Sequence, residues 1–194
     1  MGSDYLSNPA VFVIDVVFGL YIMVIMIRFM LQWFRASFYD NPIAQALIKI
    51  TNPPLKPLRR IIPGYGGIDF AAVLLMIVLQ FIAQYLIVMV KGIDISLAYL
   101  FFYTIAELVS LFFNVFIFCI IIQVIISWVN PGAYNPALAL VNALAEPVLS
   151  PARRFIRPIG GLDLSPLVVL LALQLTKMLV IPPIKELGRI LGSA

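Results

Sequence analysis

The chain has 194 residues, of which 63% are hydrophobic and 11% are charged, and its mean hydropathy is +1.07. Soluble domains carry about a quarter charged residues, so a water-soluble fold is excluded and an integral membrane protein is indicated. The sequence has no histidine, which excludes histidine-based catalysis and histidine ligands to metal or haem. Its single cysteine, Cys119, has no partner for an intramolecular disulfide. No nucleophile–base pair or metal-ligand cluster is evident, and we expect neither enzymatic activity nor a bound cofactor.

Four apolar segments are long enough to cross about 30 Å of hydrocarbon. We place these spans at about 9–33, 70–90, 104–128 and 164–181. The apolar run around the third span begins at Leu97, and either a tilted long helix or a separate interfacial segment before Thr104 would account for its length. We expect Pro182 and Pro183 to end the fourth span. Arg28, near the end of the first span, is expected to snorkel to the headgroups, and no basic residue precedes it, so the first span should not be a cleaved signal peptide.

The connection after the first span contains a short amphipathic helix, which we expect to lie in the membrane interface. Asn41 followed by Pro42 is a typical helix start, and the apolar residues after it recur on one face. The proline-rich run 53–57 should end this helix and hold the next residues extended. The corresponding helix in the second half of the chain is expected over 136–145.

The two halves of the chain repeat one another at an offset of 94 residues. Thirteen residues of 41–80 are identical to their counterparts in 135–174, and most are Pro, Gly, Arg or Asp. These residue types fix backbone shape or charge position, so their recurrence indicates an internal duplication. We assign the repeats to 1–91 and 92–194. The predicted fold is an all-α membrane protein with four transmembrane helices in two tandem two-helix repeats, which share one orientation and are related by an axis along the membrane normal.

Eight of the thirteen basic residues lie in the two Pro/Gly/Arg-rich connections. The positive-inside rule therefore places both connections in the cytoplasm and both termini outside. In one reading, the arginines of these connections only set topology and touch anionic lipid. In the other, each connection also carries an Asp that caps the following span and holds an arginine, so that the loop becomes a rigid platform. The platform residues are Arg59, Arg60, Gly66, Gly67, Asp69, Arg153, Arg154, Gly160, Gly161 and Asp163.

Five polar side chains are predicted near mid-membrane. They are Gln80, Gln84, Asn114, Gln174 and Lys177. Polar groups at this depth are costly without partners, so we expect them to face the bundle interior. A structural hydrogen-bond layer between helices and a polar pathway for ions or water both fit this pattern. Asp15 and Glu107 are the candidate partners for the Lys177 ammonium.

Each repeat thus contains a span ending in Trp, an Asn-Pro step, a Pro-x-Leu-x-Pro-x-Arg-Arg run and a Gly-Gly-x-Asp step into a second span. This doubled unit covers nearly the whole chain and resembles the YggT family. The resemblance implies a multi-pass bacterial inner-membrane protein with no assigned enzymatic activity, and bacterial members are associated with osmotic-stress tolerance and ion homeostasis. Related single-unit proteins are linked to cell division in Gram-positive bacteria and to cytochrome assembly in chloroplasts. The second repeat departs from the first in having Glu146 in place of Asn52 and Pro158 in place of Gly64.

Two function classes stay open at this point. One is a membrane scaffold or assembly factor, which acts through an unidentified membrane protein partner and through lipid. The other is a small ion-conducting or transport protein. The sparse intramembrane charge favours the scaffold, and four short spans enclose so little space that a pathway would need a homodimer. No nucleic-acid partner is expected.

Overall fold

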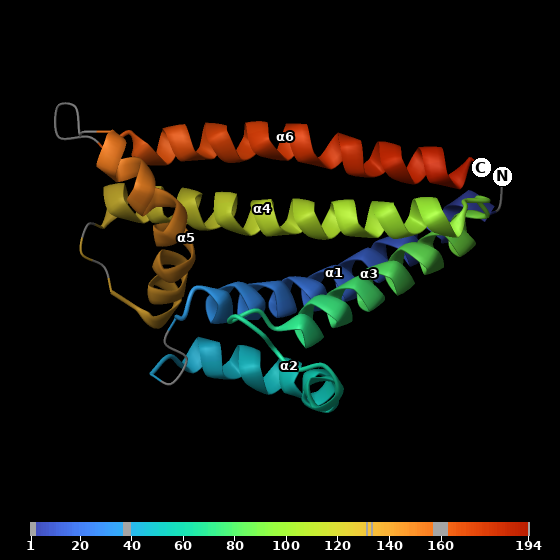
Figure 1. Ribbon diagram of the computed structural model, residues 1–194, viewed down its shortest axis with the longest axis horizontal. Helices are drawn as coiled ribbons and strands as arrows, with labels where there is room; N and C mark the ends of the chain where they lie inside the picture. The colour runs from blue at the N-terminus through green and yellow to red at the C-terminus, as the bar shows by residue number, and fades with distance from the viewer. Residues whose placement is uncertain (1–2, 37–39, 131, 133, 157–162, 194) are drawn as a thin grey trace.

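The computed structural model describes residues 3–36, 40–130, 132, 134–156 and 163–193, and the regular structure of these residues is helical (Figure 1). The helices are α1 (Ser3–Trp33), α2 (Pro42–Ile61), α3 (Phe70–Lys91), α4 (Leu97–Val129), α5 (Pro136–Phe155) and α6 (Ser165–Gly192). Four of them, α1, α3, α4 and α6, are long and apolar enough to cross a membrane. The predicted all-α membrane fold with four spanning helices is therefore confirmed.

The spanning helices form two hairpins that meet along α4. Helix α1 packs against α3, α6 packs against α4, and α4 also contacts α1, α3 and α5. Figure 1 shows the start of α1 and the end of α6 at one end of the molecule, with α5 at the opposite end. Ile25, Leu55, Ile120 and Leu149 are each 0% exposed, so one apolar core joins α1, α2, α4 and α5.

Helix α6 lies at the edge of the described bundle, where it contacts α4 and α5 but no other described helix. In the two repeats, α1 corresponds to α4, and α3 corresponds to α6. If a two-fold axis along the membrane normal related the repeats, a contact between α3 and α4 would require an equivalent contact between α6 and α1. Of these two contacts only the one between α3 and α4 is formed. The two repeats therefore do not close into a two-fold bundle, and one flank of α6 is left open.

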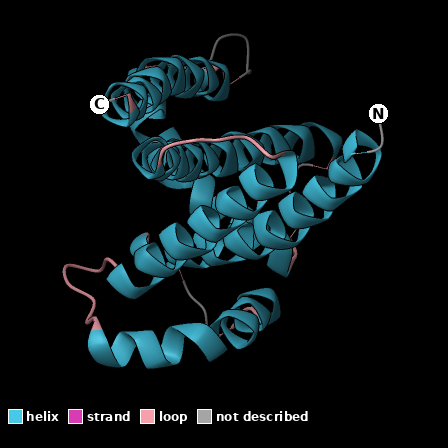
Figure 2. Cartoon of the chain, turned by 90° about the vertical axis from the view of Figure 1, so that its right-hand side faces the viewer, coloured by secondary structure: helices cyan, strands magenta, loops and turns pink. Residues whose placement is uncertain are grey.

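Helix α2 does not end at its prolines, contrary to the expectation from the sequence. It continues to Ile61 through Pro53, Pro54 and Pro57 and bends, so that one half runs across the view and the other along it (Figures 1 and 2). A proline inside a helix removes one N–H and crowds the carbonyl four residues earlier. Here the carbonyl of Ile50, freed by Pro54, accepts a 3.4 Å hydrogen bond from Tyr21 Oη of α1. Contacts from α1 thus sustain α2 through its bend. Helix α5 likewise continues through two prolines to its end at residue 155, rather than stopping near 145.

Helix α4 is one continuous helix of 33 residues from Leu97 to Val129. Ser96 caps it, with Oγ accepting the N–H of Tyr99 at 3.2 Å. The alternative of a separate interfacial segment before Thr104 is therefore wrong. At 1.5 Å per residue the helix is about 50 Å long, which exceeds the hydrocarbon thickness, so it must tilt or protrude.

Helix α6 also continues beyond the expected stop, through Pro182 and Pro183 to Gly192. Its last turns pack closely on the start of α4, because a Cβ built on Gly188 would lie 2.7 Å from Phe102 Cβ. Prolines are tolerated in membrane helices when neighbouring helices support the broken turn. Packing on α4 supplies that support, which the proline pattern alone does not reveal.

Candidate functional site

Arg59, in the last turn of α2, forms an ion pair with Asp69, the residue that caps α3. Arg59 Nε donates to Asp69 Oδ2 at 3.0 Å, and Arg59 Nη2 donates both to that oxygen and to Gln32 Oε1 of α1 at 3.2 Å. The second carboxylate oxygen, Asp69 Oδ1, accepts the N–H of Ala72 at 3.2 Å, which satisfies a free donor at the start of α3. Asp69 is 3% exposed. The Asp69 carboxylate thus joins α2 to α3, and the Arg59 guanidinium that it holds extends the contact to α1.

The second repeat forms the same pair between Arg153 of α5 and Asp163. Arg153 Nε donates to Asp163 Oδ2 at 3.0 Å, and Asp163 Oδ1 accepts the N–H of Ser165 at the start of α6 at 2.9 Å. Arg153 Nη1 also donates to Glu146 Oε2 at 2.9 Å. In each repeat, therefore, an arginine at the end of the short helix holds the aspartate that precedes the next spanning helix. The expectation that each aspartate caps its span is confirmed for Asp69 but wrong for Asp163, because the cap residue of α6 is Leu164, without a side-chain hydrogen bond.

The two pairs differ in the exposure of their aspartates. The side chains of Arg59 and Arg153 are similarly exposed, at 33% and 37%, whereas that of Asp69 is 4% and that of Asp163 is 37% exposed. Partial burial alone would raise the pKa of Asp163, but the hydrogen bonds from Ser165 and from the Arg153 guanidinium outweigh it and lower that pKa below the ordinary value of an aspartate. The second pair is consequently a solvent-screened contact, and the first is the stronger structural element.

The glycines of the first loop form a tight turn. Gly66 and Gly67 have φ of 63° and 86°, in the left-handed region that glycine adopts without strain. The turn Tyr65–Ile68 is closed by two backbone hydrogen bonds of 3.2 and 3.0 Å. The counterparts in the second repeat, Gly160 and Gly161, lie outside the described residues.

The second arginine of each repeat takes no part in these pairs. Arg60 and Arg154 are exposed, and neither forms an ion pair with any described residue. Arg60 lies instead along a pocket on α2 with Lys49 and Lys56. The structure therefore divides the arginines of the predicted platform into Arg59 and Arg153, which pair with the aspartates before the next spans, and Arg60 and Arg154, which have no ion-pair partner among the described residues.

Arg28 of α1 is a buried residue whose contacts the sequence analysis missed. It is 5% exposed and does not snorkel to the headgroups as expected. Its guanidinium donates to Thr51 Oγ1, to Asn52 Oδ1 at 2.9 Å and to the carbonyl of Ile48 at 3.4 Å, all on α2. The proline run gives no signal for these contacts, because Pro53, Pro54 and Pro57 free the carbonyls four residues earlier, and the Ile48 carbonyl is not among them.

These contacts have no equivalent in the second repeat. At the offset of 95 set by Trp33 and Trp128, the counterpart of Arg28 is Gln123. The Oε1 atom of Gln123 is buried without a hydrogen-bond partner among the described residues. The hydrogen bonds by which Arg28 joins α1 to α2 are thus particular to the first repeat.

Two polar pairs join α4 to α6 within the membrane-spanning region. Lys177 Nζ donates to Asn114 Oδ1 at 2.7 Å, and Lys185 Nζ donates to Glu107 Oε1 at 2.9 Å. The suggestion that Lys177 pairs with Asp15 or Glu107 is therefore wrong, because Glu107 is held by Lys185 and no ion pair between described residues includes Asp15. Lys177 and Asn114 lie at the same depth, whereas Glu107 lies about two helical turns nearer to the start of α4.

A small polar cavity of about 160 Å³ lies between α1, α3 and α4, and its polar lining includes Gln80, Glu107 and Asn114. Gln84 is half-buried on α3, and Gln174 is exposed on α6. The structure thus brings part of the predicted polar layer together around one cavity but does not unite the two symmetry-related glutamines. The cavity has room for a few water molecules.

A tandem pair of span–loop–span units, each braced by an arginine–aspartate pair, defines the class as a multi-pass α-helical membrane protein built by internal duplication. The chain belongs to the family described as CCB3/YggT, whose profile matches it twice, over residues 7–90 and 102–184. The two matches confirm that two copies of the unit occur in tandem.

The relatives of this chain span nearly its full length. It is 46% identical over 178 residues to the Pseudomonas aeruginosa "Uncharacterized protein PA0392", covering 91% of this chain and 90% of that protein. It is 34% identical over 187 residues to "Uncharacterized protein YggT" of Escherichia coli K12, covering 95% of each. A shorter match, 39% identical over 66 residues, joins 34% of this chain to 71% of "Uncharacterized protein ycf19" of Guillardia theta. No solved structure matches the chain.

Proposed function

We propose that this protein is a non-enzymatic membrane scaffold or assembly factor of the bacterial inner membrane, which contributes to osmotic-stress tolerance and ion homeostasis. The stress and ion roles come from the family resemblance. The observation that carries the scaffold role is the recurrence of the Arg–Asp pair. In both repeats this pair joins the end of the short helix to the residue that precedes the next spanning helix, at 3.0 Å between Nε and Oδ2.

The first loop suits recognition of a partner protein. It is held at both sides, by Arg59 at the end of α2 and by Asp69, which caps α3, so little of its conformational entropy remains to be lost on binding. Beside each pair stands an exposed arginine, Arg60 or Arg154, without an acidic partner among the described residues. The positive-inside rule puts both loops in the cytoplasm, where a membrane or cytoplasmic partner would meet them.

A second candidate function is a conduit for ions or water. The polar cavity lined by Gln80, Glu107 and Asn114 favours it, together with the adjoining Lys177 at mid-span. The cavity is small, and the open flank of α6 would need a second copy of the chain to enclose a longer path. We rank this function below the scaffold.

Two experiments separate the candidates. In a deletion strain grown at high salt, variants that break the Arg–Asp pairs should fail to restore growth if the protein is a scaffold. In liposomes, purified protein should show no ion flux above that of empty vesicles. Flux that Lys177→Met changes would instead favour the conduit, because a fixed charge dominates the potential of a narrow pore.

A further inference from the structure

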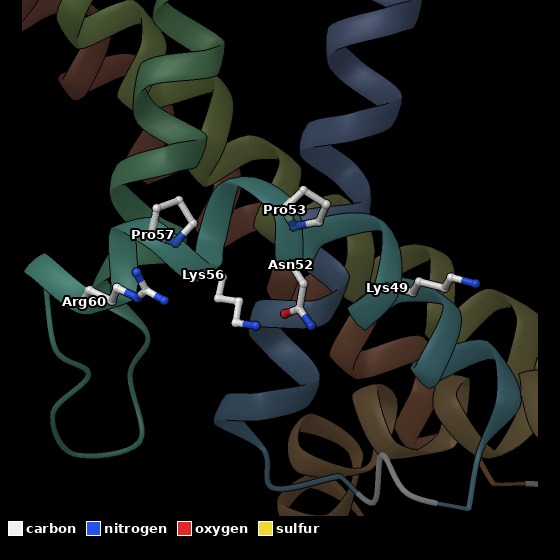
Figure 3. Close-up of a pocket in the computed structure, with 6 residues that line it drawn as sticks. All are labelled: Lys49, Asn52, Pro53, Lys56, Pro57 and Arg60. Atoms are coloured by element: carbon white, nitrogen blue, oxygen red, sulfur yellow. The ribbon is translucent and has the colours of Figure 1, made fainter.

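The bend of α2 forms a pocket of about 460 Å³ whose lining is rich in hydrogen-bond donors (Figure 3). The described lining residues are Lys49, Asn52, Pro53, Lys56, Pro57 and Arg60. Figure 3 shows Asn52 and Lys56 between Lys49 at one end of the row and Arg60 at the other. The cationic residues are spaced seven and four apart, which places them along one side of a helix.

No carboxylate of the described residues pairs with these three cations. Lys49, Lys56 and Arg60 are exposed, and none of the ion pairs between described residues includes any of them. Three like charges along about three turns of one helix repel one another. An anion in the pocket would relieve that repulsion, so the arrangement favours a negatively charged ligand.

The side-chain amide of Asn52 is oriented to donate as well. Its Oδ1 accepts the 2.9 Å hydrogen bond from Arg28 Nη2. This contact uses the acceptor atom of the amide and leaves Nδ2, which can only donate, for the pocket. Arg28 of α1 is itself buried, and its guanidinium is hydrogen-bonded to the backbone of α2. The Asn52 amide is therefore held in place before any ligand arrives.

The second repeat lacks this arrangement. At the offset of 94, the donors Lys49, Asn52 and Lys56 are replaced by Ala143, Glu146 and Ser150. Of the four donor residues, only Arg60 has an identical counterpart, Arg154. Glu146 would repel an anion, and it binds Arg153 instead. The donor pocket is thus a property of one repeat rather than a by-product of the shared fold or of the positive-inside rule.

We propose that the bend of α2 is a binding site for a phosphate group, held by Lys49, Lys56, Arg60 and the amide of Asn52. A phosphate offers only acceptor oxygens, which match ammonium, guanidinium and amide donors. Its source is either the headgroup of an anionic phospholipid or a free phosphate compound. This inference goes beyond the scaffold proposal and does not depend on it, since the two Arg–Asp pairs form without a ligand on α2.

The test uses the purified full chain in a neutral detergent, titrated by calorimetry with dihexanoyl phosphatidylglycerol or with sodium phosphate at matched ionic strength. We expect saturable binding of one probe or both. Binding of phosphatidylglycerol alone assigns the site to a lipid headgroup, and binding of inorganic phosphate assigns it to a soluble phosphate. If neither probe binds saturably, the proposal is overturned.

Three variants show whether binding occurs at the pocket. Asn52→Asp keeps the acceptor for Arg28 but puts a carboxylate among the donors, and Lys56→Gln removes one exposed charge. Each should weaken binding about tenfold or more, the size of one charge-assisted hydrogen bond. Arg154→Gln, the matched change in the second repeat, should leave the affinity unchanged. Because Lys56 is exposed and has no ion-pair partner among the described residues, Lys56→Gln provides the test even if Asn52→Asp fails to fold. Wild-type affinity in Lys56→Gln, or an equal loss in Arg154→Gln, would refute the site.

Discussion

Arg28 Nη2 lies 2.9 Å from Asn52 Oδ1, although the two residues are 24 positions apart and belong to different helices. The bond joins a spanning helix to the bend of a proline-rich helix, and it turns a buried charge into a structural anchor. Thr51 and Asn52 would lose their donor if the guanidinium were removed.

Replacing Arg28 should therefore destabilise the first repeat. We expect Arg28→Met to lower the free energy of unfolding by about 1–3 kcal/mol, the cost of leaving buried polar groups unpaired. Denaturant unfolding in detergent measures this change. The matched variant is Gln123→Leu in the second repeat, where the buried Oε1 has no partner among the described residues, and it should be neutral or stabilising. Equal losses in the two variants would contradict the account of α2.

Close packing of α6 on α4 predicts a second stability effect. A Cβ on Gly188 would lie 2.7 Å from Phe102 Cβ and 3.4 Å from the Cα of Tyr99. Gly188→Ala should therefore cost about 1–3 kcal/mol through overpacking. Gly19→Ala is the control, because nothing lies within 4 Å of a Cβ at that position. Thermal unfolding of both variants compares them, and an unchanged melting temperature for Gly188→Ala would count against the continuous α6.

The four spans could be predicted from the length and apolar composition of their segments. The Arg–Asp pairs were one of two readings of the connections, and the recurrence of Arg59 and Asp69 as Arg153 and Asp163, ten residues apart in both repeats, was the signal for them. The contacts of Arg28 occur once and depend on how α1 crosses α2, which no repeat reveals. Helix ends at proline were predicted wrongly because local propensity was overridden by packing between helices.

The titration of Asp163 gives a prediction for pH. Its pKa is lowered in the folded protein, so its contribution to stability is present above the pKa of an unfolded aspartate and is lost as the pH falls through the folded pKa. Arg153→Ala should raise the pKa of Asp163 part of the way back, because the bonds from Ser165 remain. Carboxyl ¹³C chemical shifts followed against pH measure this. The effect on stability should be small, since the pair is exposed.

The orientation in the membrane is a further prediction. Single cysteines introduced by Lys56→Cys and Ser150→Cys should resist an impermeant thiol reagent in intact cells and react after permeabilisation, because the positive-inside rule places both positions in the cytoplasm. Cys119 is 6% exposed, so background labelling should be low. Labelling of either position in intact cells would reverse the orientation.

As a scaffold, the protein would act through the surface that its two Arg–Asp pairs hold in place. The most direct measurement is growth at high salt of a deletion strain that carries each variant at matched membrane levels. Arg59→Ala combined with Arg153→Ala breaks both ion pairs but leaves Arg60 and the α2 pocket intact, and it should fail to restore growth. Lys177→Met removes the mid-span charge and should restore growth fully. Full rescue by the double arginine variant together with loss of rescue by Lys177→Met would contradict the scaffold and favour the conduit.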